Sequence, residues 1–442
     1  MTRVSLVSLG CPKALVDSQD IVTNLARNGF EIAQSAGVND TDVVVINTCG
    51  FIDAARDESY DAIEDALAVH EHVIVTGCLG SQAEELSRRY PRLTAVTGPQ
   101  ATAEVVDAVT GVAQPSGNVE YLMGPEGVRL TPAHYAYLKI SEGCNHGCSF
   151  CIIPSLRGAL RSRPIDAVLR EAERLVDTGV QELLVIAQDT SAYGVDLRYE
   201  ARSWRGRELR SDIVTLAEAL GEMAPWVRLH YVYPYPHVDR LIPLMAERRI
   251  LPYIDMPLQH ASPGILRAMR RPAASEAALA RIQAWRGLCA DLTIRSTFVV
   301  GFPGETDADF EMLLSFLVEA ELDRVGCFTY SNVAGAAANR LEGHVEERVK
   351  LDRQEMLLEV QAAISARRLR ERIGSVVEVL VDEVDERRAL ARSAADALDI
   401  DGIVEIKDAA GLSPGDITLV RITGATDHDL VADNVGRSLD VR

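Results

Sequence analysis

The sequence predicts an α/β protein in three parts, and three patterns support this prediction. Short apolar strands alternate with amphipathic helices over residues 1–100, which is typical of a parallel α/β sheet domain. Six further strand and helix units indicate an open, partial (β/α) barrel, related to the eight-stranded barrel. From Gly374 onward, short strands separated by turns indicate a small C-terminal β-barrel. We place the three domains at residues 1–115, 130–365 and 370–440.

The N-terminal part carries three cysteines in equivalent positions. Each of Cys11, Cys49 and Cys78 follows the C-terminal end of a predicted strand and has a glycine beside it. These strands are Val4–Leu9, Asp42–Asn47 and His72–Thr76, and the helices after them are 17–28, one passing through Tyr60 and Leu67, and 84–89. The loops at the carboxyl ends of parallel strands open into one crevice. We therefore expect a site of three thiolates; three unrelated buried thiols are the alternative.

A turn-rich connection is predicted over residues 101–133, followed by the central α/β series. Its predicted strands are Ala136–Ile140, Glu182–Ala187, Val227–Tyr231, Tyr253–Met256, Thr293–Val300 and Val325–Tyr330. Its predicted helices are Pro164–Thr178, Asp212–Met223 and Ala273–Ala290, and a charged helix over 346–370 is expected to act as a connector. In the C-terminal part we expect strands at Val376–Val381, Gly402–Ile406 and Ile417–Thr423.

Three more cysteines form a C-x3-C-x2-C loop after the first central strand: Cys144, Cys148 and Cys151. A tetrahedral zinc site or a closed iron–sulfur cluster normally uses four protein ligands, and no fourth cysteine is near in sequence. Three thiolates on a four-iron cluster leave one iron open, which can bind S-adenosylmethionine (SAM) and pass an electron to its sulfonium. The spacing, with Phe150 just before the last cysteine, resembles the signature of the radical SAM superfamily.

Composition and charge limit the function further. The 442 residues are 47% hydrophobic and 25% charged, without a signal peptide or a membrane-length apolar run, so we expect a cytoplasmic protein. Eight cysteines in such a chain are ligands or core residues rather than disulfides, and Cys289 and Cys327 are expected to pack in the core. The net charge of −20 disfavours binding to bare nucleic acid and favours basic partners, unless the acidic surface only serves solubility.

Taken together, the two cysteine sets, the Gly301-Phe-Pro-Gly-Glu-Thr306 segment and the terminal β-barrel resemble the methylthiotransferase family. The resemblance covers nearly the whole chain. It implies an N-terminal methylthiotransferase domain, a central radical SAM domain and a C-terminal TRAM domain. It also implies two 4Fe–4S clusters and SAM as cofactors: the Cys144 set would hold the SAM-cleaving cluster, and the Cys11 set an auxiliary cluster that carries or supplies sulfur.

Several stretches resemble the family branch that modifies an aspartate of ribosomal protein S-twelve (uS12) rather than adenosine in transfer RNA. They are Ala187–Gly194, Met256–His260 and the run from Arg392 to Gly402, in which Leu398 stands where proline is expected. The C-terminal residues 371–442 hold 8 basic and 16 acidic residues, a net charge of −8, which suits a basic protein better than a phosphate backbone. The branch implies uS12 as partner, free or within the small ribosomal subunit, and an electron donor such as flavodoxin or ferredoxin.

In this branch the reacting carbon is an unactivated methylene, which no side-chain base deprotonates readily, so a cofactor-derived radical has to remove the hydrogen atom. By analogy with the superfamily, the backbone around Phe150 is expected to contact the adenine of SAM. Gln188 is a candidate for SAM or substrate, and capping of its loop is the alternative. Strand alternation puts Arg295 and Thr297 on one face, from which Arg295 could pair with the SAM carboxylate.

Gln259 and His260 end another strand and are candidates for substrate binding, although a lone histidine there is more often structural. Two rival functions stay open. A transfer-RNA methylthiotransferase would use the same cofactor residues and would need a basic stripe. A non-catalytic cysteine-rich binding protein would need closed four-ligand sites, for which His146 is the only nearby candidate to complete the Cys144 set.

Overall fold

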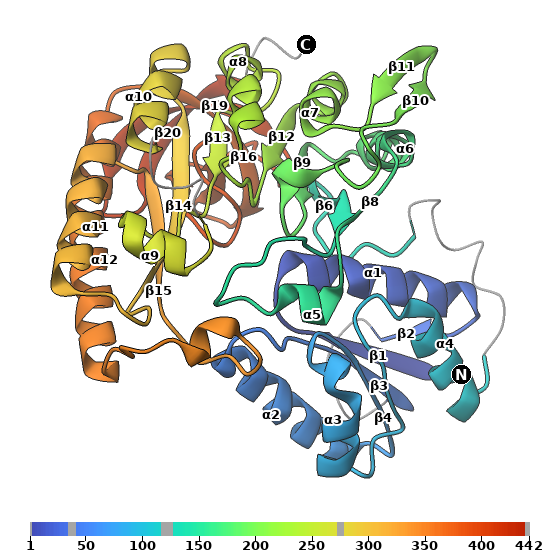
Figure 1. Ribbon diagram of the computed structural model, residues 1–442. Coiled ribbons are helices and arrows are strands. Elements are labelled where there is room, and N and C mark those ends of the chain that lie inside the picture. The colour runs from blue at the N-terminus through green and yellow to red at the C-terminus, as the bar shows by residue number, and fades with distance from the viewer. Residues whose placement is uncertain (1, 34–40, 116–126, 272–277, 438–442) are drawn as a thin grey trace.

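The computed structural model describes residues 2–33, 41–115, 127–271 and 278–437, and it confirms the predicted fold class. The N-terminal domain is a five-stranded sheet in the order β2-β1-β3-β4-β5, parallel throughout (Figure 1). Its strands are β1 (Arg3–Ser8), β2 (Glu31–Ile32), β3 (Val43–Thr48), β4 (His72–Gly77) and β5 (Ala95–Val96). Its helices are α1 (Pro12–Arg27), α2 (Asp53–Val69), α3 (Ala83–Arg89) and α4 (Thr102–Val112), with a 3-10 turn at Leu79–Gln82.

Helices cover both faces of this sheet. α1 and α4 pack on one face through side chains that include Ile21, Leu25, Val105 and Val109, whereas α2 and α3 cover the other. The prediction of a connection over 101–133 was wrong for its first part, because Val105 and Val109 are one helical turn apart and bury together. α1 begins five residues earlier than predicted, with Pro12 in the first turn, where a proline costs no hydrogen bond.

The central domain is built on six parallel strands in the order β15-β14-β13-β12-β9-β6. The strands are β6 (Tyr135–Lys139), β9 (Glu182–Ile186), β12 (Trp226–Leu229), β13 (Tyr253–Asp255), β14 (Thr293–Val300) and β15 (Arg324–Thr329). The helices are α5 (Ile153–Arg157), α6 (Ile165–Asp177), α7 (Ile213–Gly221), α8 (Leu241–Ala246), α9 (Pro263–Ala268), α10 (Ala278–Leu288), α11 (Asp307–Ala320) and α12 (Glu347–Glu371). Two antiparallel pairs are added: β7 (Ser141–Glu142) with β8 (Arg161–Ser162), and β10 (Ala201–Trp204) with β11 (Arg207–Arg210). Of the helix predicted at Ala273–Ala290, residues 273–277 lie outside the described residues.

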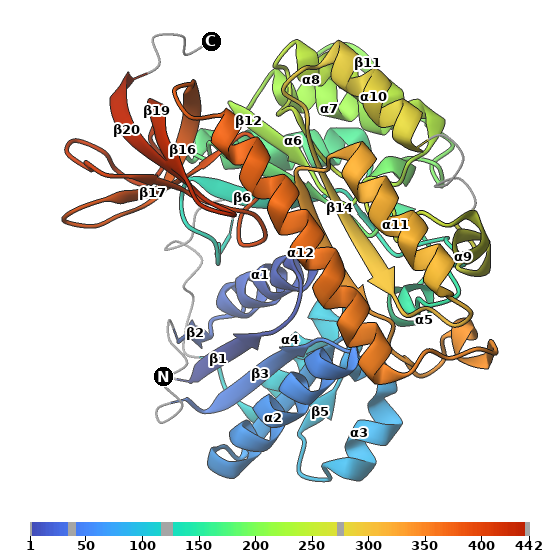
Figure 2. The ribbon, with the colours of Figure 1, turned by 90° about the vertical axis from the view of Figure 1, so that its left-hand side faces the viewer.

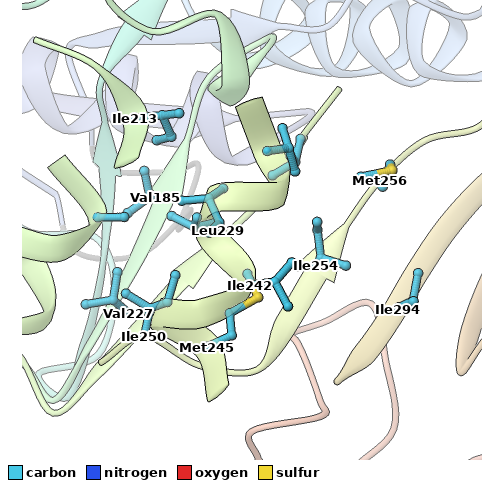
Figure 3. Packing of buried hydrophobic residues seen from close by; sticks show 14 of the residues in the cluster. Val185, Ile213, Val227, Leu229, Ile242, Met245, Ile250, Ile254, Met256 and Ile294 are labelled. Atoms are coloured by element: carbon cyan, nitrogen blue, oxygen red, sulfur yellow. The ribbon is translucent and has the colours of Figure 1, made fainter. Parts of the chain in front are cut away.

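The two faces of the central sheet have different roles. Alternate strand residues, such as Val185, Val227 and Ile254, pack outward against the helices in the main hydrophobic core (Figure 3). α12 belongs to this core through Leu357 and Ile364, so it is more than the connector that the sequence predicted (Figure 2).

The inner face of the central sheet is covered by the other two domains. Val16 of α1 packs against the inner residues Tyr137, Leu184 and Ile186. A second inner cluster joins Trp226 and Tyr253 to Leu380 and Ala397 of the C-terminal barrel.

The C-terminal domain is a closed barrel in the order β16-β17-β18-β20-β19. Its strands are β16 (Val376–Val384), β17 (Ala389–Ser393), β18 (Val404–Ile406), β19 (Ile417–Ala425) and β20 (Leu430–Arg437). Three of the five strands were predicted, whereas β17 and β20 were missed. The outer part of the barrel projects away from the rest of the molecule (Figure 2).

Buried ion pairs bind the barrel to the central sheet. Glu182 of β9 accepts hydrogen bonds from Arg228 Nε at 2.8 Å and from Arg392 of the barrel. Arg324 Nη2, at the start of the edge strand β15, donates to Asp396 Oδ1 at 2.6 Å. The barrel is therefore an integral part of the fold. No helix among the described residues has the length and apolar character needed to cross a membrane.

Candidate active site

The loop after β7 gathers Cys144, Cys148 and Cys151, which we call the Cys144 group. The N–H of Cys144 donates to Gly158 O at 3.1 Å, and that of Cys151 to Cys148 O at 3.2 Å, so the backbone fixes the loop. The backbone N–H groups of His146 and Ile153 point at the Sγ atoms of Cys144 and Cys151, both at 3.4 Å. Such donors stabilise negative charge on sulfur, as a thiolate ligand requires.

Three side chains from elsewhere in the central domain hold this loop: Asp189, Tyr233 and Arg271. His146 Nε2 is hydrogen-bonded to Asp189 Oδ2 at 2.7 Å, and its ring stacks on Tyr233 with centroids 4.4 Å apart. Arg271 donates from Nη1 to Cys148 Sγ at 3.5 Å and lies over the same tyrosine ring. The imidazole of His146 is thus hydrogen-bonded to the Asp189 carboxylate, and the guanidinium of Arg271 lies beside the sulfur of Cys148.

Cys11, Cys49 and Cys78, which we call the Cys11 group, lie at the carboxyl ends of β1, β3 and β4. The three loops approach one another closely: a Cβ atom on Gly10 would lie 3.0 Å from Cys49 Cβ, and one on Gly50 would lie 2.9 Å from the backbone N of Leu79. Glycine is needed where backbones approach this closely. The structure therefore brings together the three loops that the sequence analysis expected to meet.

The free thiols differ in acidity. Burial raises the pKa of Cys151 to about 11 and also raises the pKa values of Cys144, Cys49 and Cys78. Burial acts on Cys11 as well, but the ammonium of Lys13 and the backbone N–H groups of the first turn of α1 hold the pKa of Cys11 below its ordinary value. Metal ligation requires thiolates, so loading of either group releases protons.

The donor set of each group fits an open-sided iron–sulfur cluster. All eight cysteines are free, and the two outside these groups, Cys289 and Cys327, are buried in the central core. Among the described residues, no three His, Cys, Asp or Glu side chains are placed to hold a single metal ion. A four-iron cluster spaces its thiolates more widely than one ion does, and three of them leave one iron without a protein ligand.

Four ionic side chains, which we call the charged bridge, lie between the N-terminal and central domains beside the Cys11 group: Asp17, Lys139, Glu142 and Arg157. Arg157 donates from Nε to Cys78 Sγ at 3.3 Å and from Nη1 to Glu142 Oε1 at 2.9 Å, and its Nη2 lies 3.1 Å from Asp17 Oδ2. Lys139 pairs with Asp17 and, at 3.2 Å, with Glu142. Because α1 supplies Asp17 and the central domain supplies the other three, the bridge fixes the two domains against each other. The sequence analysis missed it.

The remaining predicted site residues are scattered. Phe150 packs against a small apolar cluster that includes Phe302 and Tyr330. Gln188 donates from Nε2 to Glu142 Oε1 at 2.7 Å, and its own carbonyl oxygen is buried without a hydrogen-bond partner among the described residues. That unsatisfied oxygen beside the charged bridge is free to accept a hydrogen bond from a bound molecule.

Arg295 and Thr297 face the inner side of the sheet, but Arg295 is already paired. Its Nη1 lies 3.1 Å from Asp255 Oδ1, and its Nε lies 3.4 Å from Asp401 of the barrel. Thr297 Oγ1 accepts a hydrogen bond from the same arginine at 3.4 Å. The structure places Arg295 in the contact with the barrel and Thr297 beside Arg295, which sequence reasoning could not anticipate because Asp401 is far away in the sequence.

The predicted substrate residues differ in access. Gln259 is half-buried and adopts a φ of 71°, with its backbone hydrogen-bonded to Thr297 and Val299. The His260 side chain is 0% exposed; its Nδ1 accepts a hydrogen bond from the N–H of Ser262, and its Nε2 lies 3.5 Å from Glu305. This burial leaves His260 no surface for a substrate and favours a structural role for it.

Family comparisons identify the three domains. Residues 138–317 match the Radical SAM superfamily, residues 3–98 match the Uncharacterized protein family UPF0004, and residues 373–435 match the TRAM domain. A solved radical S-adenosylmethionine methyltransferase, TsrM from Kitasatospora setae, superposes with a TM-score of 0.52 at 13% identity, covering 74% of this chain and 73% of that one. This likeness shows the fold alone. The fold and the cysteine groups together define a radical SAM protein.

Full-length relatives narrow the class. The ribosomal protein uS12 methylthiotransferase RimO of Aromatoleum aromaticum is 58% identical over 431 residues, 97% of each chain. The proteins of the same name from an Azoarcus species and from Methylobacillus flagellatus are 58% and 57% identical, over 98% and 97% of this chain and of theirs. The chain belongs to the family of ribosomal protein uS12 methylthiotransferases. It is a radical SAM methylthiotransferase, and its cofactors are SAM and two 4Fe–4S clusters.

The contact between Arg271 and Cys148 predicts a measurable effect. Replacing Arg271 with methionine removes the only side-chain donor to this sulfur among the described residues, and loss of such a supporting partner typically costs about 10- to 100-fold in metal affinity or activity. We expect reduced iron retention at the Cys144 group and slower SAM cleavage. Arg267→Met, at an exposed position of α9, is the matched control. Equal iron content and cleavage in both variants would refute the role.

Proposed function

We propose that this protein attaches a methylthio group to the β-carbon of an aspartate in ribosomal protein uS12. The observation that carries the proposal is the presence of two three-cysteine groups, with a charged bridge joining the domains that hold them, in a chain that is 58% identical over 97% of its length to a uS12 methylthiotransferase. Cys144, Cys148 and Cys151 would hold the cluster that reductively cleaves SAM, and Cys11, Cys49 and Cys78 the cluster that supplies sulfur.

The protein's own residues would position and protect these groups. Arg271 and Arg157 place guanidinium groups on the sulfurs of Cys148 and Cys78, which offsets the negative charge of bound thiolates. α1 and the barrel cover the inner face of the central sheet and exclude water from it. A dry site matters because a reactive radical is quenched by unwanted donors.

The remaining assignments of the sequence analysis belong to this proposal. The backbone around Phe150 would contact the adenine of SAM, and Gln188 would use its unsatisfied carbonyl oxygen on SAM or substrate. Gln259 is half-buried and would face substrate. For Arg295 and Thr297 the barrel contact supports a positioning role rather than a SAM contact. The proposal also includes the domain limits 1–115, 130–365 and 370–440. It further includes a cytoplasmic location and reduction of the protein by flavodoxin or ferredoxin.

The decisive comparison is between two substrates. The reconstituted, reduced protein would be incubated anaerobically with SAM and either uS12 or transfer RNA, and each product analysed by mass spectrometry. We expect one aspartate of uS12 to exchange a hydrogen for a methylthio group, and the RNA to stay unchanged. Methylthiolation of adenosine instead would overturn the substrate assignment. Formation of 5′-deoxyadenosine with neither substrate modified would also overturn it, while leaving the radical chemistry intact.

The acidic barrel predicts how the basic substrate is captured. Glu383, Glu386 and Asp427 are exposed barrel residues, and electrostatic attraction to a basic partner acts mainly on the association rate. The triple change to the corresponding amides is expected to raise KM for uS12 several-fold and to weaken its salt dependence, with kcat unchanged. Glu355→Gln with Glu359→Gln, on the exposed side of α12, is the control. An unaltered KM in the barrel variant would show that uS12 docks elsewhere.

A further inference from the structure

Lys13 is a buried cation at the junction of the N-terminal and central domains. It lies in the first turn of α1, two residues after Cys11, and is only 9% exposed. Its Nζ stands 3.5 Å from the centroid of the Tyr231 ring. Tyr231 follows β12, at the carboxyl edge of the central sheet, where barrel enzymes place their chemistry.

Lys13 forms no ion pair with a carboxylate among the described residues, and its electrostatic partners are Tyr231 and the Cys11 thiol. The nearby carboxylate, Asp17, is taken by Lys139 and Arg157. A cation–π contact offsets only part of the cost of burying a cation. The cost of removing an ammonium from water is several kcal/mol, so a buried cation usually requires a paired and hydrogen-bonded partner. A buried ammonium without a carboxylate partner is placed to receive one from a ligand.

The surroundings of Lys13 define where that anion would lie. On one side the ammonium is close enough to Cys11 to lower the pKa of its thiol, and on the other it contacts Tyr231 of the central domain. The backbone of Tyr231 is itself fixed, because its N–H donates to Asp255 Oδ2 at 3.2 Å. An anion bound here would therefore sit beside the Cys11 group and at the reactive edge of the central sheet.

We propose that Lys13 binds the side-chain carboxylate of the substrate aspartate and thereby sets the preference for an acidic residue. The inference rests on the proposed function. The carbon that receives sulfur is directly bonded to that carboxylate, so a salt bridge to Lys13 would place the reacting carbon next to the Cys11 group. Lysine carries its charge at a single point with rotatable donors, which suits a carboxylate that enters and leaves at each turnover.

A role limited to balancing the charge of a cluster on Cys11 makes different predictions. In that case removal of the lysine would lower iron content or shift the cluster's reduction potential, and any uS12 variant would be affected equally. Substrate recognition instead predicts a coupling between Lys13 and the carboxylate of the target residue, which a double-mutant cycle isolates.

The test combines Lys13→Met with a uS12 variant that carries asparagine in place of the target aspartate. A hydrogen bond to a charged group contributes about 1.5–3 kcal/mol, so wild-type enzyme should favour aspartate over asparagine by about tenfold or more in kcat/KM and in binding affinity. The Lys13→Met variant should lose this preference while its iron content stays at the wild-type level. Lys13→Arg, which keeps the charge, should retain part of the preference.

A stability measurement gives a second, independent readout. Because methionine fills similar volume without an unpaired charge, Lys13→Met is expected to match or exceed the wild-type protein in Tm. An undiminished preference for aspartate in Lys13→Met overturns the proposal, and so does a fall in iron content with the preference intact. A wild-type enzyme that modifies no uS12 at all overturns the proposed function itself, and this inference with it.

Discussion

Replacement of Cys148 with alanine is expected to abolish the cleavage of SAM to 5′-deoxyadenosine. With two thiolates left, the Cys144 group can no longer hold a four-iron cluster in which a single iron is open to SAM. Cys148 is also the sulfur that receives the Arg271 guanidinium, so its loss removes one partner of a buried cation. The assay is 5′-deoxyadenosine formation by reduced, reconstituted protein, measured by chromatography with mass detection.

The matched control is Cys327→Ala. This cysteine is also buried in the central domain, on β15, but belongs to neither cysteine group. It is expected to keep its full iron content and SAM cleavage. Wild-type cleavage by the Cys148 variant, or equal loss in both variants, would remove the Cys144 group from the chemistry.

A large loss of stability is expected from Glu182→Ala. Glu182 is fully buried and pairs with Arg228 and, across the contact with the barrel, with Arg392, which are 0% and 2% exposed at the side chain. Removal of one partner from a buried ion pair leaves uncompensated charge and typically costs about 3–5 kcal/mol. We expect this loss in the unfolding free energy measured with denaturant. Glu222→Ala, which removes exposed pairs with Arg207 and Arg249, should leave the unfolding free energy nearly unchanged.

The same carboxylate predicts a dependence of stability on pH. Burial alone would raise the pKa of Glu182, but Arg228 and Arg392 hold its pKa below the ordinary value. A group whose folded pKa is lowered contributes fully above its unfolded pKa and loses that contribution as the pH falls through the lowered value. The stability difference between wild type and Glu182→Ala should therefore shrink in acid. A difference that stays constant would show that Glu182 is not the titrating group.

Local sequence patterns predicted most of the fold but not the contacts between domains. β14 was predicted with its observed bounds, Thr293–Val300, because alternating apolar residues mark a strand clearly. α4 (Thr102–Val112) was missed because this short helix buries only two side chains. β17 and β20 were missed because these strands are defined mainly by their pairing with other strands of the barrel, which the local sequence does not reveal.

The candidate site shows the same division. The positions of the Cys11 group after three parallel strands were sufficient to predict that their loops meet. Arg157 and Arg271 were not predicted, since they are 79 and 123 residues from the cysteines that they contact. Substrate binding by His260 stays a prediction: a histidine at such a strand end is more often structural, and its burial against Glu305 favours that alternative.

The most direct test of the account is the triple variant Cys11→Ala, Cys49→Ala and Cys78→Ala, assayed with SAM and uS12. If the two cysteine groups hold separate clusters with separate tasks, the variant retains half of the iron and still produces 5′-deoxyadenosine, but it transfers no methylthio group. Methylthiolated uS12 at the wild-type level would contradict the account, because sulfur would then reach the substrate without the Cys11 group.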